Sequence, residues 1–278
     1  MKTMRRHGPG YIFSRLALLL LLLATFFPLV MMVNMSLKPT VLISTDFLSL
    51  PLEPYLTNFT KAFEFVKRPI LNSLYICALS LLGILINATL SGYAFARLRF
   101  RGKKAMYSIL VAVLMVPATI TIVPQFLIVS KLGLINTYWA LILPYIGSQQ
   151  VLGVILCRTA FEQMPQEFFD AAKIDGANEL QAMSMIGLPL LRPTLITVGI
   201  QAVVAIYNDY IWPTVALTGG DEMKTFCQIV YNNSQGLLRT DIGLLCAAFI
   251  IGTIPLGIAT CCCLKYYLRG MVAGAIKG

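Results

Sequence analysis

Five of the chain's 12 acidic residues fall in one stretch, residues 158–192. The ionisable side chains of this stretch are Glu162, Glu167, Asp170, Asp175 and Glu179, with the bases Arg158, Lys173 and Arg192. Five acids against three bases give the stretch a formal net charge of −2. Helices that lie on a lipid surface normally present bases to anionic headgroups, so an acidic segment is better suited to a groove in another protein. A surface helix in the headgroup layer is the simpler alternative.

The first half of this stretch has the signals of a short helix closed by a sharp turn. Pro165 suits the first helical position, and Glu167 and Lys173 place an acid and a base where the helix dipole favours them. A helix is therefore expected over about residues 165–174, and Gly176 suits the left-handed residue that closes it. The residues expected on one face of this helix are Phe168, Ala171, Ala172 and Ile174 or Asp175.

The second half predicts another short helix. Asn178 is a plausible N-cap, and Gln181 stands three residues later, as in a capping box. Leu188 and Pro189 are expected to end this helix. Together the two halves predict a helix, a turn and a helix, which form a rigid knob.

No catalytic or metal-binding pattern accompanies these residues. The chain lacks the GxxxxGK[ST], HExxH and GxSxG motifs, and His7 is its only histidine. Its seven cysteines show no CxxC spacing and are expected to be small apolar residues of buried or lipid-facing helices, with acylation of residues 261–263 a minor alternative. We expect no enzyme, no metal site and no cofactor in this chain, so any energy from ATP must come from another polypeptide.

Long apolar segments position these residues. Of the 278 residues, 58% are hydrophobic and 12% are charged, about half the charged fraction of a soluble domain, and the mean hydropathy is +0.77. Six segments can cross a bilayer: 16–37, 69–96, 105–130, 132–157, 193–213 and 242–264. We therefore predict an all-α integral membrane protein with six transmembrane helices in a single domain, residues 1–278. Pro117 and Pro124 are expected to kink the third helix and place it inside the bundle.

The distribution of Lys and Arg predicts the orientation. With the N-terminus inside, 15 of the 22 basic residues fall in inside segments and seven in outside ones, so both termini are expected in the cytoplasm. Residues 158–192 then form the largest cytoplasmic loop, and residues 38–68 and 214–240 form the outside loops. The sequence NFTKAFEF, from Asn58, is expected to form a short interfacial helix in the first outside loop. The net charge of +10 indicates topology and contact with anionic lipid, and no nucleic-acid partner is expected.

The first apolar segment follows a basic start, as a secretory signal would. Its apolar run is too long for a signal peptide, and the sequence MVNMSLKP, from Met32, offers no small-residue cleavage site. We therefore interpret it as the first transmembrane helix.

The acidic stretch resembles the EAA loop of ABC-importer permeases, whose signature is P…EAA…DGA…I.LP. The matching residues are Pro165, Asp170-Ala171-Ala172, Asp175-Gly176-Ala177 and Ile186-Gly187-Leu188-Pro189. The resemblance extends over nearly the full chain to the permeases of carbohydrate importers, especially the maltose-type second subunit. The other matching pieces are NSL from Asn72, SGYAFARLRFRGK from Ser91, LGLINT from Leu132, YNDYIWP from Tyr207 and the closing RGMVAGAIKG. Asp170 replaces the family's glutamate and is one methylene shorter.

The resemblance implies the fold of an ABC type I importer permease and a role in coupling. The knob would dock in a cleft of a cytoplasmic ATPase subunit and transmit its closure to the membrane helices. The residues implied to do so are Asp170, Ala171, Ala172, Asp175, Gly176, Ala177, Leu188 and Pro189. The implied partners are a second permease, a cytoplasmic ABC ATPase dimer that binds ATP and Mg, and an extracytoplasmic solute-binding protein, at a bacterial or archaeal cytoplasmic membrane. The tail, residues 269–278, would contact the ATPase pair.

The resemblance also implies a solute path between this chain and the second permease. The side chains that offer hydrogen bonds and an aromatic face near it are those of Tyr207, Asn208, Asp209 and Trp212. This combination suits a sugar, and it suits an aromatic belt at the membrane interface equally well.

Gly219 and Gly220 form a flexible tip in the region implied to reach the binding protein, and an ordinary turn is the alternative.

The expected function is ATP-driven import of a sugar, polyol or sugar phosphate. The rival function is an ion-coupled carrier, which would show paired ionisable groups at midplane and repeated halves.

Overall fold

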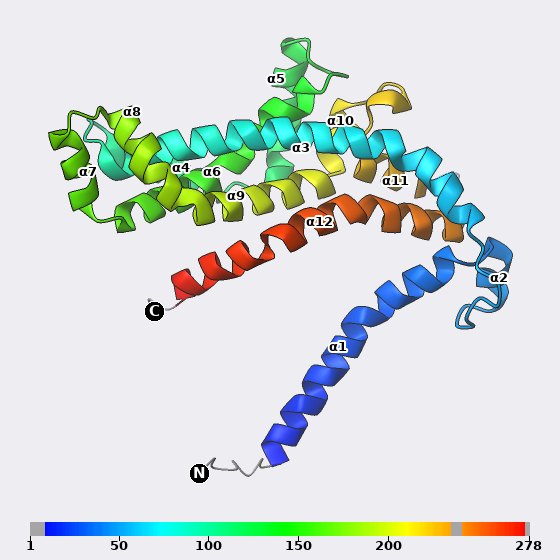
Figure 1. Ribbon diagram of the computed structural model, residues 1–278. Coiled ribbons are helices and arrows are strands. Elements are labelled where there is room, and N and C mark those ends of the chain that lie inside the picture. Colours follow the sequence, from blue (N-terminus) through cyan, green and yellow to red (C-terminus); the bar gives the residue numbers. More distant parts are fainter. Residues whose placement is uncertain (1–8, 235–240, 276–278) are drawn as a thin grey trace. The chain divides into compact units, whose positions relative to one another are not determined.

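The computed structural model describes the backbone of residues 9–234 and 241–275 and the side chains of residues 13–234 and 241–263 (Figure 1). All regular elements within these ranges are helices. The basic residues among the first eight positions lie outside the described ranges. The chain divides into two compact units, one formed by Met1–Val66 with Asn232–Gly252 and the other by Lys67–Tyr231 with Thr253–Gly278.

Five helical segments of the described chain are long and apolar enough to cross a membrane. They are Phe13–Ser36, Thr57–Arg97, Trp139–Gln163, Glu179–Asn208 and Ile242–Cys263. A sixth candidate is a bent pair of helices, Lys103–Val113 and Ala118–Lys131, which meet at 104°. The predicted all-α membrane architecture is therefore confirmed, with six spans if the bent pair is one span.

The first unit contains helix α1 (Pro9–Ser36), the short helix α2 (Thr40–Thr45) and the beginning of α3 (Thr57–Arg97). The prediction of a separate interfacial helix at NFTKAFEF is wrong, because this sequence forms the first turns of α3. The buried face of α3 already begins in this sequence, since Ala62 and Val66 are buried one turn apart. The helix then continues through Pro69 into the second span.

The buried ammonium of Lys38 holds the loop that joins α1 to α3. Its Nζ donates to the carbonyl oxygens of Asp46 and Phe47, at 3.2 and 3.4 Å, and to Ser49 Oγ at 3.2 Å. Because a charge in a dry environment requires such acceptors, these contacts stabilise the loop close to the end of α1. The apolar tip of the loop stays open, and Leu52 is fully exposed.

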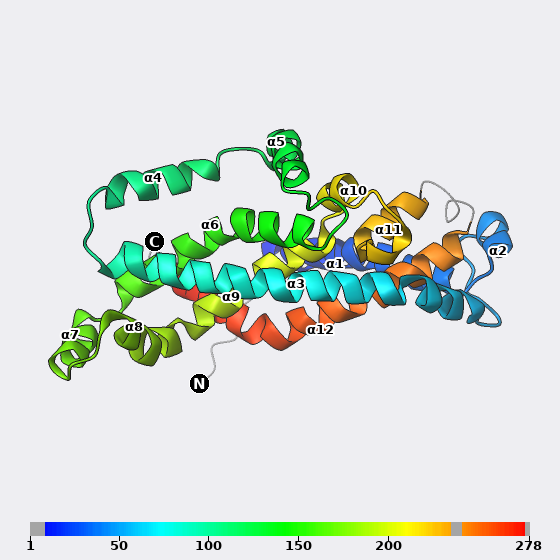
Figure 2. The same ribbon diagram turned by 90° about the horizontal axis from the view of Figure 1, so that it is seen from above.

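Three helices of the second unit, α3 from Lys67 onward, α6 (Trp139–Gln163) and α9 (Leu188–Asn208), lie side by side (Figures 1 and 2). Small residues permit this close approach. A Cβ placed on Gly92 of α3 would lie 2.6 Å from Cys157 Cβ of α6. Gly153 of α6 likewise lies against Ala88 of α3 and Val198 of α9, so the three helices pack closely against one another, as small residues allow in membrane bundles.

The third predicted span differs from expectation. Pro117 does not kink one helix but separates α4 (Lys103–Val113) from α5 (Ala118–Lys131), because a proline disfavours the helical backbone of the residue before it. None of the residues of α4 is buried, and α5 buries only Val129. The expectation that this span lies inside the bundle of this chain was therefore wrong.

Candidate functional site

The acidic stretch begins in the last turns of α6 and continues with helix α7 (Gln166–Ile174), which confirms the predicted helix to within one residue. Pro165 is its N-cap residue and not its first helical residue. At the other end Gly176 adopts φ +83°, and Ala177 N–H donates to Ala172 O at 2.9 Å. The left-handed glycine expected at this turn is present, and a Cβ there would meet nothing within 4 Å. Gly176 therefore serves backbone geometry and not close packing.

The second short helix, α8 (Glu179–Ala182), has the predicted capping box. Asn178 Oδ1 accepts from Gln181 N–H at 2.9 Å, and Gln181 Oε1 accepts from Asn178 N–H at 2.8 Å. These two reciprocal bonds fix the direction in which the chain leaves the turn.

Leu188 and Pro189 do not end this helix, contrary to expectation. The chain continues from α8 through a π-helical turn, Met183–Gly187, directly into α9. Gly187 packs on Phe161 of α6, where a Cβ would lie 2.8 Å from Phe161 Cε1. Pro189 occupies the first turn of α9, where proline costs little. The fifth span therefore begins at Glu179, and the second half of the knob is continuous with a membrane helix.

The face that α7 buries was only partly predicted. Ala172 is buried as expected, but Phe168 is half exposed and Ile174 is 86% exposed. The buried aromatic residue is Phe169, which is 2% exposed. Because two phenylalanines are adjacent in the sequence, periodicity alone could not decide which of them faces the bundle.

Arg97, at the end of α3, contacts the first half of the knob. Its guanidinium carbon lies 4.4 Å from the centre of the Phe169 ring, and its Nη2 donates to Phe161 O and Met164 O, both at 2.6 Å. Its Nη1 donates to Gln166 Oε1. A cation is favoured both at a helix C-terminus and over an aromatic face, so Arg97 ties the end of α6 to α7.

Tyr93, one turn earlier on α3, contacts the second half. Its hydroxyl donates to Glu179 Oε2 at 2.6 Å, and Lys173 Nζ lies 2.7 Å from Glu179 Oε1. The Tyr93 ring packs edge-on against Phe161, with centroids 5.3 Å apart. We call Tyr93 and Arg97 the α3 clamp. Nothing in the sequence indicated this contact: Arg97 was counted as an inside base, and both residues were noted only as part of the matching piece SGYAFARLRFRGK.

The open side of the knob forms a groove of about 760 Å³. Of the eight residues implied to carry coupling, six line it, namely Ala171, Ala172, Asp175, Gly176, Ala177 and Pro189. Asp170 and Leu188 do not line it. Asp170 is exposed, and its Oδ1 accepts from Gln166 Nε2 at 2.9 Å.

Asp209 organises the second group of candidate residues, where α9 ends and α10 (Ile211–Ala216) begins. Its Oδ1 accepts from Ile211 N–H at 2.9 Å and from Trp212 N–H at 3.3 Å, and its Oδ2 accepts from the Tyr145 hydroxyl at 2.9 Å. The carboxylate therefore pairs two N–H groups in the first turn of α10, whose N-cap residue is Tyr210, and it stabilises the break between the two helices.

A cavity of about 410 Å³ opens beside this break. Asn208, Asp209 and Trp212 line it, whereas Tyr207 does not. Tyr207 is buried, and its ring lies 5.8 Å from that of Phe226. The structure thus brings three of the four candidate path residues together. The polar lining residues that were not among the predicted path residues are Thr119, Thr121, Gln125, Tyr145, Ser148, Gln149 and Tyr210.

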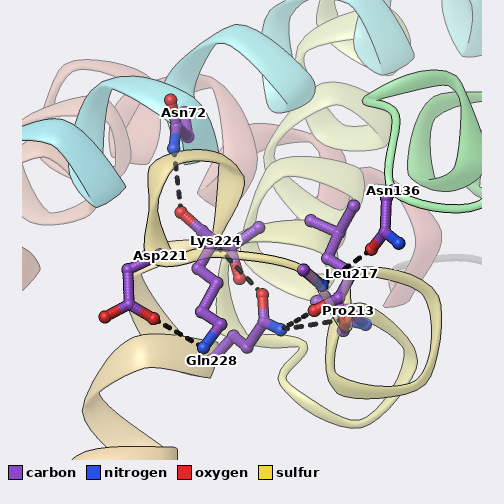
Figure 3. Close-up of polar contacts among 9 residues, drawn as sticks. Asn72, Asn136, Pro213, Leu217, Asp221, Lys224 and Gln228 are labelled. Atoms are coloured by element: carbon purple, nitrogen blue, oxygen red, sulfur yellow. Dashed lines mark hydrogen bonds and ion pairs between the residues drawn. The ribbon is translucent and has the colours of Figure 1, made fainter.

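The loop after α10 is held by amide side chains (Figure 3). Asn72 Nδ2 of α3 donates to Glu222 O and Lys224 O, both at 2.9 Å. Gln228 Nε2, on α11 (Phe226–Ser234), donates to the carbonyl oxygens of Pro213 and Leu217, at 3.0 and 2.9 Å. The loop therefore has a fixed base on two helices.

The glycines at the tip of this loop differ from each other. Gly219 N–H donates to Asn136 Oδ1 at 2.9 Å, whereas a Cβ on Gly220 would meet nothing within 4 Å. Asn136 itself has a positive φ of 60°. Gly219 is thus tied to the turn before α6, and the tip is less free than the sequence suggested.

Two remaining expectations concern the tail and metal ions. Helix α12 (Ile242–Ala275) reaches into the tail. The side chains from residue 264 onward and residues 276–278 lie outside the described part of the chain. The residues expected to contact the ATPase pair, 269–278, therefore lie outside it as well. Among the described residues, no group of three or more His, Cys, Asp or Glu side chains is arranged to hold a metal ion.

The chain matches the family model described as "Binding-protein-dependent transport system inner membrane component" over residues 80–271. The probable ABC transporter permease protein YurM of Bacillus subtilis is 30% identical, with 94% of this chain and 87% of YurM covered. The trehalose/maltose transport system permease protein MalG of Thermococcus litoralis is 28% identical, with 94% of each chain covered.

The fold also matches a solved structure. A chain of a bacterial ABC transporter involved in the import of the acidic polysaccharide alginate superimposes with a TM-score of 0.79. The match covers 96% of this chain and 100% of that chain at 21% identity. The predicted importer-permease fold is therefore confirmed.

Proposed function

We propose that this chain, which belongs to the family of binding-protein-dependent transport system inner membrane components, is the membrane-spanning permease subunit of an ATP-driven importer for sugars. Its several apolar helices make it a multi-pass protein of the inner membrane. Support for sugars comes from the similarity to a trehalose/maltose permease along almost the whole chain. The chain itself is non-catalytic, and ATP and Mg bind to the partner ATPase.

The knob is the coupling element. This proposal rests on how the knob is built. Six signature residues line one open groove, and the second half of the knob continues without a break into α9. A rigid body that enters a cleft in the ATPase dimer makes different contacts in the open and closed states of that cleft, which a flexible loop could not do. Closure of the cleft would then move α9 directly.

The proposed orientation places the knob and both termini in the cytoplasm, because the inside segments carry the excess of basic residues. The outer loop with Gly219 and Gly220 then faces the solute-binding protein. Its base on Asn72 and Gln228 would hold it ready for this contact. The solute would pass between this chain and a second permease, near Asn208, Asp209 and Trp212.

The test is radiolabelled-sugar uptake and ATP hydrolysis by the reconstituted complex, wild type against Gly176→Val. At φ +83° a β-branched residue is strained, so the knob should distort and uptake should fall while hydrolysis continues. Gly133→Val is the matched control, because Gly133 has φ +67° and equally open surroundings but lies outside the knob.

Two results would contradict the proposal. Gly176→Val with normal uptake and normal hydrolysis would refute the coupling role of the knob. Wild-type uptake driven by an ion gradient without ATP would favour an ion-coupled carrier instead.

A further inference from the structure

The cavity beside Asp209 contains polar side chains that the proposed path did not include. Gln125 of α5 and Gln149 of α6 line it from two different helices. Both side chains are half-buried, and neither amide makes a hydrogen bond within the described part of the chain. An amide has two donors and one acceptor oxygen, and leaving them unpaired in a membrane helix is unfavourable. Polar residues inside membrane segments mark substrate pathways for this reason.

The volume and the lining of the cavity suit a small polar molecule. Its volume of about 410 Å³ lies in the range of small-molecule sites, and Tyr210, 37% exposed, adds an aromatic face to its wall. Hydroxyl groups of a saccharide can both donate to and accept from an amide. Their C–H faces can pack on an aromatic ring.

The charge of the cavity selects among saccharides. Among the described residues, Asp209 is the only acid that lines it, and none of the lining residues is Lys, Arg or His. The oxygens of Asp209 already accept from two backbone N–H groups and the Tyr145 hydroxyl, so its negative charge has a structural role. An anionic sugar would meet this charge without a basic partner, which costs free energy in a poorly solvated site.

We propose that this cavity is a subsite for an uncharged saccharide, with Gln125 and Gln149 as the groups that recognise its hydroxyls and with acidic sugars disfavoured. The inference rests on the proposed function, and it narrows the solute from sugars in general to neutral ones. It also assigns part of the recognition to this chain.

The test uses the purified permease–ATPase complex without its solute-binding protein, so that only the membrane site is measured. The probes are radiolabelled maltose, trehalose, cellobiose and lactose as neutral disaccharides, and digalacturonate as an acidic one of similar size. We expect at least one neutral probe to bind and digalacturonate to bind at least tenfold more weakly. Gln125→Met and Gln149→Met should each weaken the neutral probe about 5–10-fold, because each removes one or two hydrogen bonds.

Gln150→Met is the matched control, because Gln150 is the next residue of the same helix and does not line the cavity. It should bind the neutral probe as wild type does. Thermal unfolding of the complex without sugar separates recognition from packing. Removing an unpaired amide should leave the melting temperature unchanged or raise it, whereas removing a structural amide lowers it.

Three results would overturn the inference: digalacturonate binding as tightly as the neutral probes, glutamine variants that bind like Gln150→Met, or a lower melting temperature without sugar for both glutamine variants. A wild-type complex that neither binds any probe nor imports it with ATP would contradict the proposed function itself. These outcomes distinguish a wrong subsite from a wrong function.

Discussion

Among single residues, Asp170 is bonded within the knob and is also exposed to a partner. It stands where the family signature has glutamate, and its Oδ1 accepts from Gln166 Nε2 at 2.9 Å. Gln166 in turn accepts from Arg97 through its side-chain oxygen. The carboxylate is thus held on the exposed side of α7, where a basic residue of a partner could reach it. The shorter side chain of aspartate keeps the charge close to the helix.

We predict that Asp170→Asn will lower ATP-dependent uptake about tenfold, because a neutral amide loses a charge-assisted contact with the ATPase. Asp170→Glu should retain uptake, since it restores the residue of the family signature. Glu167→Gln serves as the control, because Glu167 is an exposed acid of the same helix outside the signature. Equal uptake by Asp170→Asn and wild type would show that the charge at this position plays no part in docking.

At the scale of elements, the α3 clamp makes the knob part of the bundle. The knob is covalently joined to α6 and α9. The clamp adds α3, because Arg97 contacts α7 and Tyr93 contacts α8. All three packed helices therefore contact the knob. A displacement of the knob would be passed to α3 as well as to α9, provided that the clamp stays closed.

The clamp can be opened without changing the knob itself. We predict that Arg97→Gln and Tyr93→Phe will each lower the number of sugar molecules imported per ATP, while hydrolysis continues. For Arg97→Gln we also expect a loss of about 2–3 kcal/mol in stability, since hydrogen bonds from a charged group to two carbonyls are removed. Arg99→Gln is the control for charge, because Arg99 is exposed and not part of the clamp. An unchanged import ratio in both clamp variants would mean that α3 is not coupled to the knob.

Local signals predicted the turn of the knob well, and distant contacts explain the errors. Gly176 and Asn178 act on backbone groups within a few residues, so their roles are visible in the sequence. The continuation past Pro189 depends on Gly187 packing on Phe161, a residue of another helix. The contacts of Arg97 with the knob could not be predicted either, because its acceptors Phe161 and Met164 lie more than 60 positions away.

The same limit applies to the cavity. Asn208, Asp209 and Trp212 were found because they are neighbours in the sequence. Gln125 and Gln149 come from two other helices, and only the packing of these helices brings them to one wall. Composition could predict that the chain spans a membrane, but not which polar side chains would meet inside it.

For the whole molecule, the proposed mechanism depends on which side of the membrane each loop occupies. The knob must face the ATPase in the cytoplasm, and the loop from residue 38 to residue 56 must face outward. The excess of basic residues in the inside segments favours this arrangement. The two surfaces also offer residues of high exposure for a direct measurement, Ile174 at 86% in the knob and Leu52 at 102% in the loop.

We predict that a cysteine at Leu52 will react with a membrane-impermeant maleimide in right-side-out vesicles, and that a cysteine at Ile174 will react only in inverted ones. The experiment requires a background in which the seven native cysteines are replaced, because Cys261 and Cys262 are themselves exposed. Both test positions are open in this chain, so a difference in labelling reports the side of the membrane and not burial. Added ATPase subunit should then protect Ile174→Cys in inverted vesicles, since a docked knob is covered. Labelling of Ile174→Cys from outside would reverse the orientation and remove the physical basis for coupling to a cytoplasmic ATPase.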